Sequence, residues 1–295
     1  MKPHLLLPLL SFLTSCVIPG AYLPSRSGAD LVLPLHFRAD APHVNASINR
    51  HRPISMLLDT GASVSVLEAN LAAMNEISQT GRGTSIKGIH GSAAARQGII
   101  RSFDLGSWHT ENVSCYIRAS TSQRPGGLGS AILGIDHLRR SCSFVTYDYR
   151  AHRVELGFGR SFIPDGNRLT RTPFRMVNGL PMIRVSTGGI SWDAVVDTGS
   201  SWGIVIDQST AARLGQAQGG LGMGRGLMLK GVGGSVRADQ AGARIIRGPA
   251  VSLCGQMYDS PQLYVMPGPK RIGSRFWHGS RMTLDFRTST LWLER

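Results

Sequence analysis

Short hydrophobic runs alternate with turn-forming residues along most of this chain of 295 residues. Runs of Leu, Ile and Val that are a few residues long and bounded by Gly, Pro, Asn or Asp are typical of β-strands joined by tight turns. Strands are predicted at residues 31–37, 54–58, 182–186 and 192–196, a hairpin turn at 187–189, and strand pairs at 147–156 and 282–293. Short helices are predicted at 136–140 and directly after Gly273. No internal stretch reaches the roughly 18 apolar residues of a transmembrane helix.

The hydrophobic pattern repeats between the two halves of the chain. The strands at 54–58 and 192–196 both lead into the triplet Asp-Thr-Gly. Further segments match in the same order: residues 86–92 with 229–235, Cys115 with Cys254, 132–134 with 271–273, and 147–150 with 284–287. Matches that keep their order and nearly their spacing indicate a duplicated unit.

Pro, Gly and Asn collect between the two copies, near residues 162–167, which is typical of a boundary. We therefore divide the chain into three parts. Residues 1–28 are a leader and linker, residues 29–160 an N-terminal lobe, and residues 161–295 a C-terminal lobe.

Composition limits the possible partners. Hydrophobic residues make up 42% of the chain, enough for a buried core, and the formal net charge is +14. The basic residues are scattered in ones and twos without interleaved aromatic residues, so no nucleic-acid partner is expected. The charge fits either an ordinary basic surface or one that attracts anionic lipid or other polyanions.

The N-terminus has the pattern of a secretory signal, with Lys2, an apolar run at 5–10, and small residues up to Cys16. Residues 13–16 resemble a bacterial lipobox, which predicts cleavage before Cys16 and lipidation of that cysteine. Simple cleavage further along, or an uncleaved segment, are the alternatives. We expect an exported protein of the bacterial cell envelope or periplasm, anchored by lipid. Lipid and a basic surface would together supply two signals for membrane association.

No metal or other cofactor is expected. The remaining cysteines, Cys115, Cys142 and Cys254, allow at most one internal disulfide, and neither Cys-x-x-Cys nor His-Glu-x-x-His occurs. The Gly-rich stretch at 220–226 lacks the preceding strand and the acidic residue of a dinucleotide site. It is predicted to be a flexible insertion.

In each copy, Asp-Thr-Gly is followed by a glycine-rich hairpin and then by a segment ending in Gly before a short helix. This order resembles the retropepsin-like branch of the aspartic peptidases over residues 30–158 and 170–295. The resemblance implies an all-β acid-protease fold. It would have two homologous retropepsin-like β-barrel lobes related by a pseudo-twofold axis, with Asp59 and Asp197 at the centre. Arg271 departs from the pattern, because the family has a hydrophobic residue there. Both lobes are complete in one chain, so a monomer is expected.

The same resemblance implies an aspartic endopeptidase with Asp59 and Asp197 as its catalytic pair. Two carboxyl groups about 3 Å apart cannot both ionise, as is known for aspartic proteases. One activates a water that attacks the peptide carbonyl, and the other donates a proton to the carbonyl oxygen. The alternative is a catalytically silent protein of the same fold that binds peptides or regulates another envelope protein.

Four residues next to the aspartates are expected to support them. The resemblance implies that Thr60 and Thr198 hydrogen-bond across the lobe interface; local turn capping is their alternative role. Gly61 and Gly199 follow the carboxylates, where a sharp turn favours a residue with positive φ.

The two copies differ one residue further on, where Ala62 in the first corresponds to Ser200 in the second. In pepsin-like relatives a serine at this position bonds its own aspartate, and such a bond favours the charged carboxylate. Asp197 is therefore expected to be the ionised partner and Asp59 the protonated one.

The glycine-rich hairpins are predicted to be flaps over the substrate. An extended peptide would bind beneath them as an added strand. Their tips are Gly88, Ile89, His90 and Gly91 in the first copy and Gly231, Val232, Gly233 and Gly234 in the second. His90 has no counterpart in the second hairpin, and it is either an exposed loop residue or a substrate contact.

Overall fold

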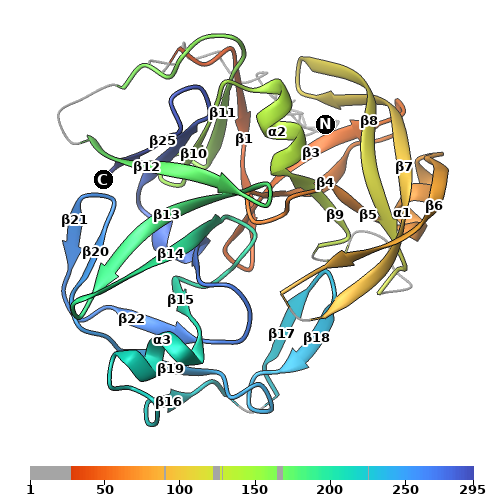
Figure 1. The fold of residues 1–295 in the computed structure, drawn as a ribbon. Helices are drawn as coiled ribbons and strands as arrows, with labels where there is room; N and C mark the ends of the chain where they lie inside the picture. Colours follow the sequence, from red (N-terminus) through yellow and green to blue (C-terminus); the bar gives the residue numbers. More distant parts are fainter. Residues whose placement is uncertain (1–27, 90, 122–126, 128, 165–168, 225) are drawn as a thin grey trace, which may run out of the picture.

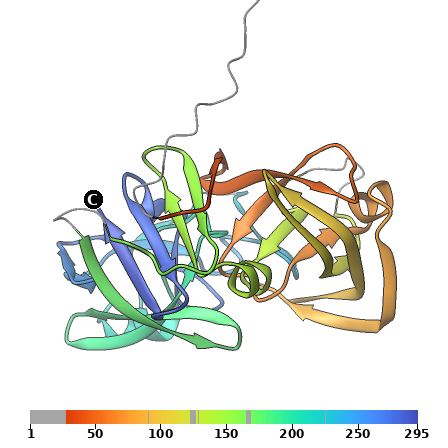
Figure 2. The same cartoon turned by 90° about the horizontal axis from the view of Figure 1, so that it is seen from above.

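The computed structural model describes residues 28–89, 91–121, 127, 129–164, 169–224 and 226–295, and within them the regular secondary structure is mainly β-strand. The described residues include four short helices: α1 Ala69–Met74, α2 Ile135–Ser141, α3 Gln208–Arg213 and α4 Ser274–Trp277. None of the helices in these ranges has the length and apolar character needed to cross a membrane. The three parts of the molecule are two lobes and a sheet between them (Figures 1 and 2).

The first half forms a closed barrel. Its strands are β2 His36–Arg38, β3 Ala41–Ile48, β4 Ile54–Asp59, β5 Val66–Glu68, β6 Ser78–Lys87, β7 Ser92–Leu105, β8 Trp108–Arg118 and β9 Ala131–Gly134. They pair in the order β2-β3-β4-β9-β5-β8-β7-β6, and an additional pairing of β3 with β7 closes a ring of six strands. Closure removes the free edges of those strands.

The second half repeats this pairing scheme, but its strands are shorter than the long strand β7 of the first half. Its strands are β13 Leu180–Thr187, β14 Ile190–Asp197, β15 Ile204–Ile206, β16 Leu221–Gly222, β17 Met228–Gly231, β18 Gly234–Arg237, β19 Arg244–Arg247, β20 Val251–Leu253, β21 Gln256–Tyr258, β22 Gln262–Val265 and β23 Arg271–Gly273. The β4–β9 pair is parallel, β9–β5 antiparallel and β5–β8 parallel. The β14–β23, β23–β15 and β15–β22 pairs have the same senses. The predicted duplication is therefore visible in the strand topology.

A shared sheet connects the two lobes, in the order β1-β11-β10-β24-β25-β12. Its strands are β1 Leu31–Pro34, β10 Phe144–Asp148, β11 Arg153–Gly157, β12 Leu169–Val177, β24 Arg281–Asp285 and β25 Thr290–Glu294. The halves join along β10 and β24, where Thr146 and Thr283 lie opposite each other and their hydroxyls are 2.7 Å apart. These strands confirm the pairs predicted at 147–156 and 282–293.

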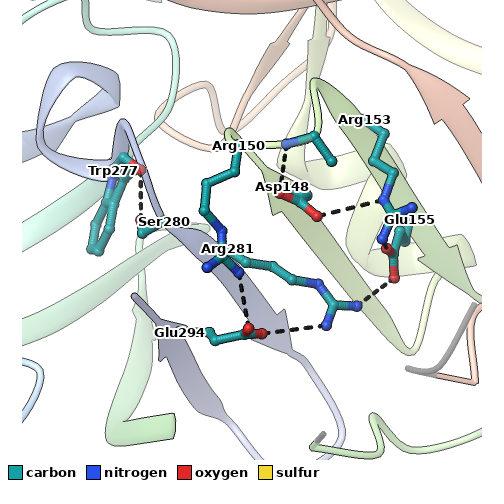
Figure 3. A network of polar contacts seen from close by, with 9 residues as sticks. Asp148, Arg150, Arg153, Glu155, Trp277, Ser280, Arg281 and Glu294 are labelled. Atoms are coloured by element: carbon teal, nitrogen blue, oxygen red, sulfur yellow. Dashed lines mark hydrogen bonds and ion pairs between the residues drawn. The ribbon is translucent and has the colours of Figure 1, made fainter. Parts of the chain in front are cut away.

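An ion-pair network crosses this sheet (Figure 3). Buried Glu155 on β11 pairs with Arg281 on β24 at 2.6 Å and with Arg153 at 3.1 Å. Arg281 also lies 3.6 Å from Glu294. The exposed side chain of Arg150 contacts the same glutamate, with 2.9 Å between the two side chains. A buried charge is tolerated only when it is paired, so the network favours one alignment of the two halves.

Most predicted elements are confirmed, but the strand at 31–37 has a different role. It divides into β1 and β2, and β1 pairs with β11 in the shared sheet. The hairpin partner of β4 is β3, which was not predicted. β3 has the sequence Ala-Pro-His-Val-Asn-Ala-Ser-Ile, whose polar residues hide the strand pattern, although most of its side chains are buried in the barrel.

Two smaller expectations are also resolved. The Gly-rich stretch is not wholly unpaired, because Leu221 and Gly222 form an edge strand against Ile245 and Arg244. Cys115, Cys142 and Cys254 are all buried free thiols. Burial raises the pKa of each to about 12, so they are protonated at neutral pH.

Candidate active site

Each aspartate stands at the end of a strand that pairs in parallel with a glycine-ended strand. Asp59 ends β4 opposite Gly134, and Asp197 ends β14 opposite Gly273. A Cβ atom on Gly134 would lie 2.7 Å from the Val64 carbonyl, and one on Gly273 would lie 2.3 Å from the Trp202 carbonyl oxygen. Only glycine lets the loop after each aspartate pass this close to the neighbouring strand, which explains why the segment ends in Gly in both copies.

Thr60 and Thr198 exchange hydrogen bonds between the two halves. Each hydroxyl accepts from the backbone N–H of the other threonine at 3.0 Å. The Thr60 hydroxyl donates to the Val196 carbonyl and the Thr198 hydroxyl to the Leu58 carbonyl, both at 2.6 Å. Both threonines are buried. The four bonds satisfy polar groups on both loops and fix the loops relative to each other.

The two aspartates meet above the glycines of their triplets. A Cβ atom on Gly61 would lie 2.4 Å from Cγ of Asp197, and one on Gly199 would lie 2.3 Å from Cγ of Asp59. Each carboxyl group therefore occupies the space that a side chain on the opposite loop would fill. Neither glycine has a positive φ. The expected reason for these glycines was wrong: they are required by space, not by turn conformation.

Hydrogen bonds orient each carboxyl group. Backbone N–H of Gly61 donates to Asp59 Oδ1 at 2.8 Å, and backbone N–H of Ser200 donates to Asp197 Oδ1 at 3.0 Å. The two carboxyl groups also lie close enough for each to affect the pKa of the other. Two carboxyl groups this close avoid charge repulsion when one of them holds a proton.

The pKa shifts of the pair are unequal. Burial, and then the charge of Asp197, raise the pKa of Asp59 to about 8. Burial also raises the pKa of Asp197, but the positive charge of Arg271 opposes that rise. Arg271 lies beside Asp197, where its charge stabilises the ionised form of that carboxyl group. This charge favours a proton on Asp59.

Arg271 is the site residue that the sequence interpretation missed. It belongs to β23, is 2% exposed, and its Nε lies 3.7 Å from Asp197 Oδ2. The signal was present in the sequence, since Arg271 interrupts the repeat where the first copy has Ile132. In the sequence it stands out only as a departure from the family pattern.

Ser200 contacts Asp197 differently from the expectation. The bond to the carboxylate comes from its backbone N–H, and its hydroxyl instead accepts from Arg271 Nε at 3.3 Å. The structural difference between the two copies at this position therefore includes Arg271 as well as the serine that replaces Ala62.

The predicted flap segments form hairpins whose tips touch. β6 pairs with β7, and β17 pairs with β18 (Figure 1). A Cβ atom on Gly88 would lie 2.4 Å from the backbone nitrogen of Gly233, and Val232 packs against the hydrophobic cluster of the first lobe that includes Ile132. Gly91 and Gly234 at the tips have positive φ, which favours glycine.

The remaining tip residues lie beside these contacts. Ile89 approaches Gly268, where an added Cβ would lie 2.9 Å from Ile89 Cγ2. Gly231 is half-buried at the end of β17. His90, Cys16 and the leader up to residue 27 lie outside the described residues. Among the residues that are described, no group of three His, Cys, Asp or Glu side chains is placed to hold a metal ion.

Part of the sequence and the fold are similar to those of known proteins. A family model described as gag-polyprotein putative aspartyl protease matches residues 44–140, which include Asp59, the first hairpin and Gly134. No curated protein matches the chain. The solved structure of an aspartic proteinase from Irpex lacteus is similar over 90% of this chain and 96% of its own, with a TM-score of 0.56 and 16% sequence identity. The chain therefore has the predicted all-β acid-protease fold, and its first half is similar to the aspartyl protease of gag polyproteins.

Proposed function

We propose that the protein is an aspartic endopeptidase whose reaction depends on Asp59 and Asp197. The observation that carries this proposal is the position of the two carboxyl groups, each of which lies against the glycine of the opposite triplet, Gly61 or Gly199, and affects the pKa of the other. If both groups were ionised, the two carboxylates would repel each other in a buried site. This arrangement therefore favours a pair that shares one proton. The family match and the fold support the same reaction class.

In the proposed mechanism the ionised carboxylate takes a proton from a water held between the two groups. The resulting hydroxide attacks the carbonyl carbon of the peptide bond, while the protonated carboxyl donates to the carbonyl oxygen. The tetrahedral intermediate then collapses with proton transfer to the leaving nitrogen. This chemistry needs neither a metal ion nor a covalent intermediate. The unequal pKa shifts support Asp197 as the base and Asp59 as the acid; a neutron structure with the resting proton on Asp197 would reverse the assignment.

Substrate binding is proposed to occur beneath the β6–β7 and β17–β18 hairpins. Backbone groups near the tips would pair with an extended peptide, as in strand addition. The tips contact each other in this structure, so a peptide of several residues requires them to separate. We infer that hairpin opening precedes substrate entry.

We also propose that the active form is a monomer of two lobes, with their boundary between residues 160 and 161. The shared sheet and the threonine exchange already join the two halves within one chain. Activity that elutes with the monomer in gel filtration would support this proposal, and activity confined to a dimer would contradict it.

The location is proposed from the leader alone: export to the bacterial envelope and anchoring through a lipid on Cys16. Growth with a labelled fatty acid tests it directly. Label should enter the wild-type chain but not a Cys16→Ser variant. Labelling of both, or of neither, would contradict the anchor.

A catalytically silent peptide-binding protein is the alternative function. Cleavage-site profiling of a proteome with the wild-type chain and with Asp59→Asn separates the two functions. New peptide termini that appear only with the wild type support the endopeptidase. Peptide binding without any cleavage would favour the alternative.

A further inference from the structure

Arg271 places a buried positive charge beside one aspartate of the pair and not the other. In the first lobe Ile132 pairs with Leu57 in the parallel register that ends at Asp59; in the second, Arg271 pairs with Val195 in the register that ends at Asp197. The two positions are therefore equivalent. The cation is the clearest chemical difference between the two sides of the site.

The guanidinium group is held in place by several contacts. Nε donates to the Ser200 hydroxyl at 3.3 Å, and Nη1 donates to the Pro269 carbonyl at 2.9 Å. Nη2 has a weak contact with Met266 Sδ at 3.8 Å. None of these partners carries charge. Asp197 Oδ2, at 3.7 Å, is the anion that balances the buried cation.

Other charged groups on neighbouring elements form ion pairs with partners other than Arg271. The Lys270 ammonium binds Asp207 at 3.1 Å, and Arg275 binds Asp40 at 2.7 Å. On β14, Asp193 pairs at the surface with Arg175 and Arg184. Tyr147 on β10 and Tyr149 directly after this strand lie near the aspartates, but burial raises the pKa of both phenols, so they stay neutral.

We propose that Arg271 is a positioning residue of the aspartate pair: its guanidinium keeps the negative charge on Asp197 and so leaves the shared proton on Asp59. The physical reason is charge balance. A protonated Asp59, an ionised Asp197 and a cationic Arg271 sum to zero net charge in a buried site. Without the cation, the same pair would be an uncompensated buried anion, which favours protonation of both groups.

The proposed role of Arg271 predicts how the aspartate pair titrates with pH. Because the cation favours every ionised form of the pair, its removal raises both apparent pKa values that belong to the pair. The singly protonated form then exists over a range displaced to higher pH. A cation at this distance typically changes the pKa of a carboxyl group by about one to three units. Its effect on catalysis rests on the proposed function, whereas its effect on titration does not.

The experiment is a carboxyl carbon-13 NMR titration of the full chain in three forms: wild type, Arg271→Ile, which copies the first lobe, and Arg271→Lys, which keeps the charge. Asp59→Asn and Asp197→Asn spectra assign the signals. The titration of the pair should move upward by about one unit or more in Arg271→Ile and stay near wild type in Arg271→Lys. Arg247→Gln removes an exposed arginine at the end of β19 and should leave the titration unchanged.

Two results of the titration would overturn the proposal. One is a pair titration in Arg271→Ile that superimposes on wild type; the other is a wild-type spectrum in which Asp197 holds the proton. The second needs no variant of Arg271, so it applies even if Arg271→Ile fails to fold. The pH profile of kcat/KM should move in parallel with the titration. Loss of cleavage only for peptides with acidic side chains, on an unmoved pH profile, would instead make Arg271 a substrate contact and overturn the proposal. A shifted titration in a chain that cleaves no peptide would support the role of Arg271 and refute the proposed function.

Discussion

The carboxyl group of Asp59 occupies the space that a side chain on Gly199 would fill, and Asp197 has the same relationship to Gly61. Each half of the chain therefore shapes the position of the other half's carboxylate. The hydroxyls of Thr60 and Thr198 form hydrogen bonds between the two Asp-Thr-Gly loops and fix these loops relative to each other. The predictions below test separate parts of this arrangement.

Gly199→Ala should abolish cleavage with little change in the rest of the fold. The added methyl group would lie 2.3 Å from Asp59 Cγ, so the carboxyl group must move out of line with Asp197. A small displacement of a reacting group costs about 100-fold in rate. Peptide cleavage and circular dichroism measure the two properties. Gly222→Ala is the control, because a methyl group there meets no atom within 4 Å; equal activity of the two variants would contradict the prediction.

Thr198→Ala should destabilise the protein by about 2–4 kcal/mol, because it leaves the Leu58 carbonyl and the Thr60 N–H buried without a partner. Thr198→Ser keeps the hydroxyl and should lose less than about 1 kcal/mol. Denaturant unfolding gives both values. A loss of similar size in both variants would show that packing of the methyl group, not the hydrogen bonds, holds the interface.

Asp59 should make the folded state less stable as pH rises from about 4 to 8. Its pKa is raised to about 8 in the folded state, so the folded chain binds a proton that the unfolded chain, with an ordinary carboxyl pKa near 4, has released. The free energy of unfolding then falls by about 1.4 kcal/mol per pH unit in this window. Asp59→Asn cannot titrate and should show a flatter dependence. Identical slopes for the two proteins would contradict the raised pKa.

Arg281→Met should destabilise the protein by about 3 kcal/mol, since it removes the 2.6 Å partner of buried Glu155 and leaves that charge to Arg153 alone. Arg150→Met is the matched control. Its ion pair with Glu294 is exposed, so its removal should cost less than about 1 kcal/mol. Thermal and denaturant unfolding compare the two. An equal cost would mean that the network in Figure 3 does not stabilise the joined halves.

Sequence reasoning predicted the parts of this molecule that are repeated in the two halves of the chain. The repeated triplets and the repeated glycine segments identified Asp59 and Asp197 as points of equivalent loops. The helix at 136–140 is confirmed as α2, and the helix after Gly273 as α4. Repetition does not reveal why a residue is needed, however. The space above Gly61 and Gly199 depends on a partner loop far away in the sequence, and a local pattern cannot show it.

The features that sequence reasoning missed have identifiable causes. Strand β3 has a polar composition that does not look like a buried strand. It is buried because it pairs with β4 in the barrel. Helix α3 has a capping residue, Asp207, whose side chain accepts from the Thr210 N–H at 2.7 Å, and this signal was overlooked. Helix α1 has no such side-chain cap. Arg271 looked like a defect in the repeat, and its meaning depends on the 3.7 Å distance to Asp197.

The most direct test of the central claim is peptide cleavage by four purified proteins between about pH 3 and 8: wild type, Asp59→Asn, Asp197→Asn and Asp259→Asn. Asp259 is exposed and serves as the control. The account predicts cleavage by the wild type and Asp259→Asn, and a loss of at least about 100-fold in each of the other two variants, because each removes one proton-transfer group. Wild-type rates in either Asp59→Asn or Asp197→Asn would contradict a site that needs both carboxyl groups.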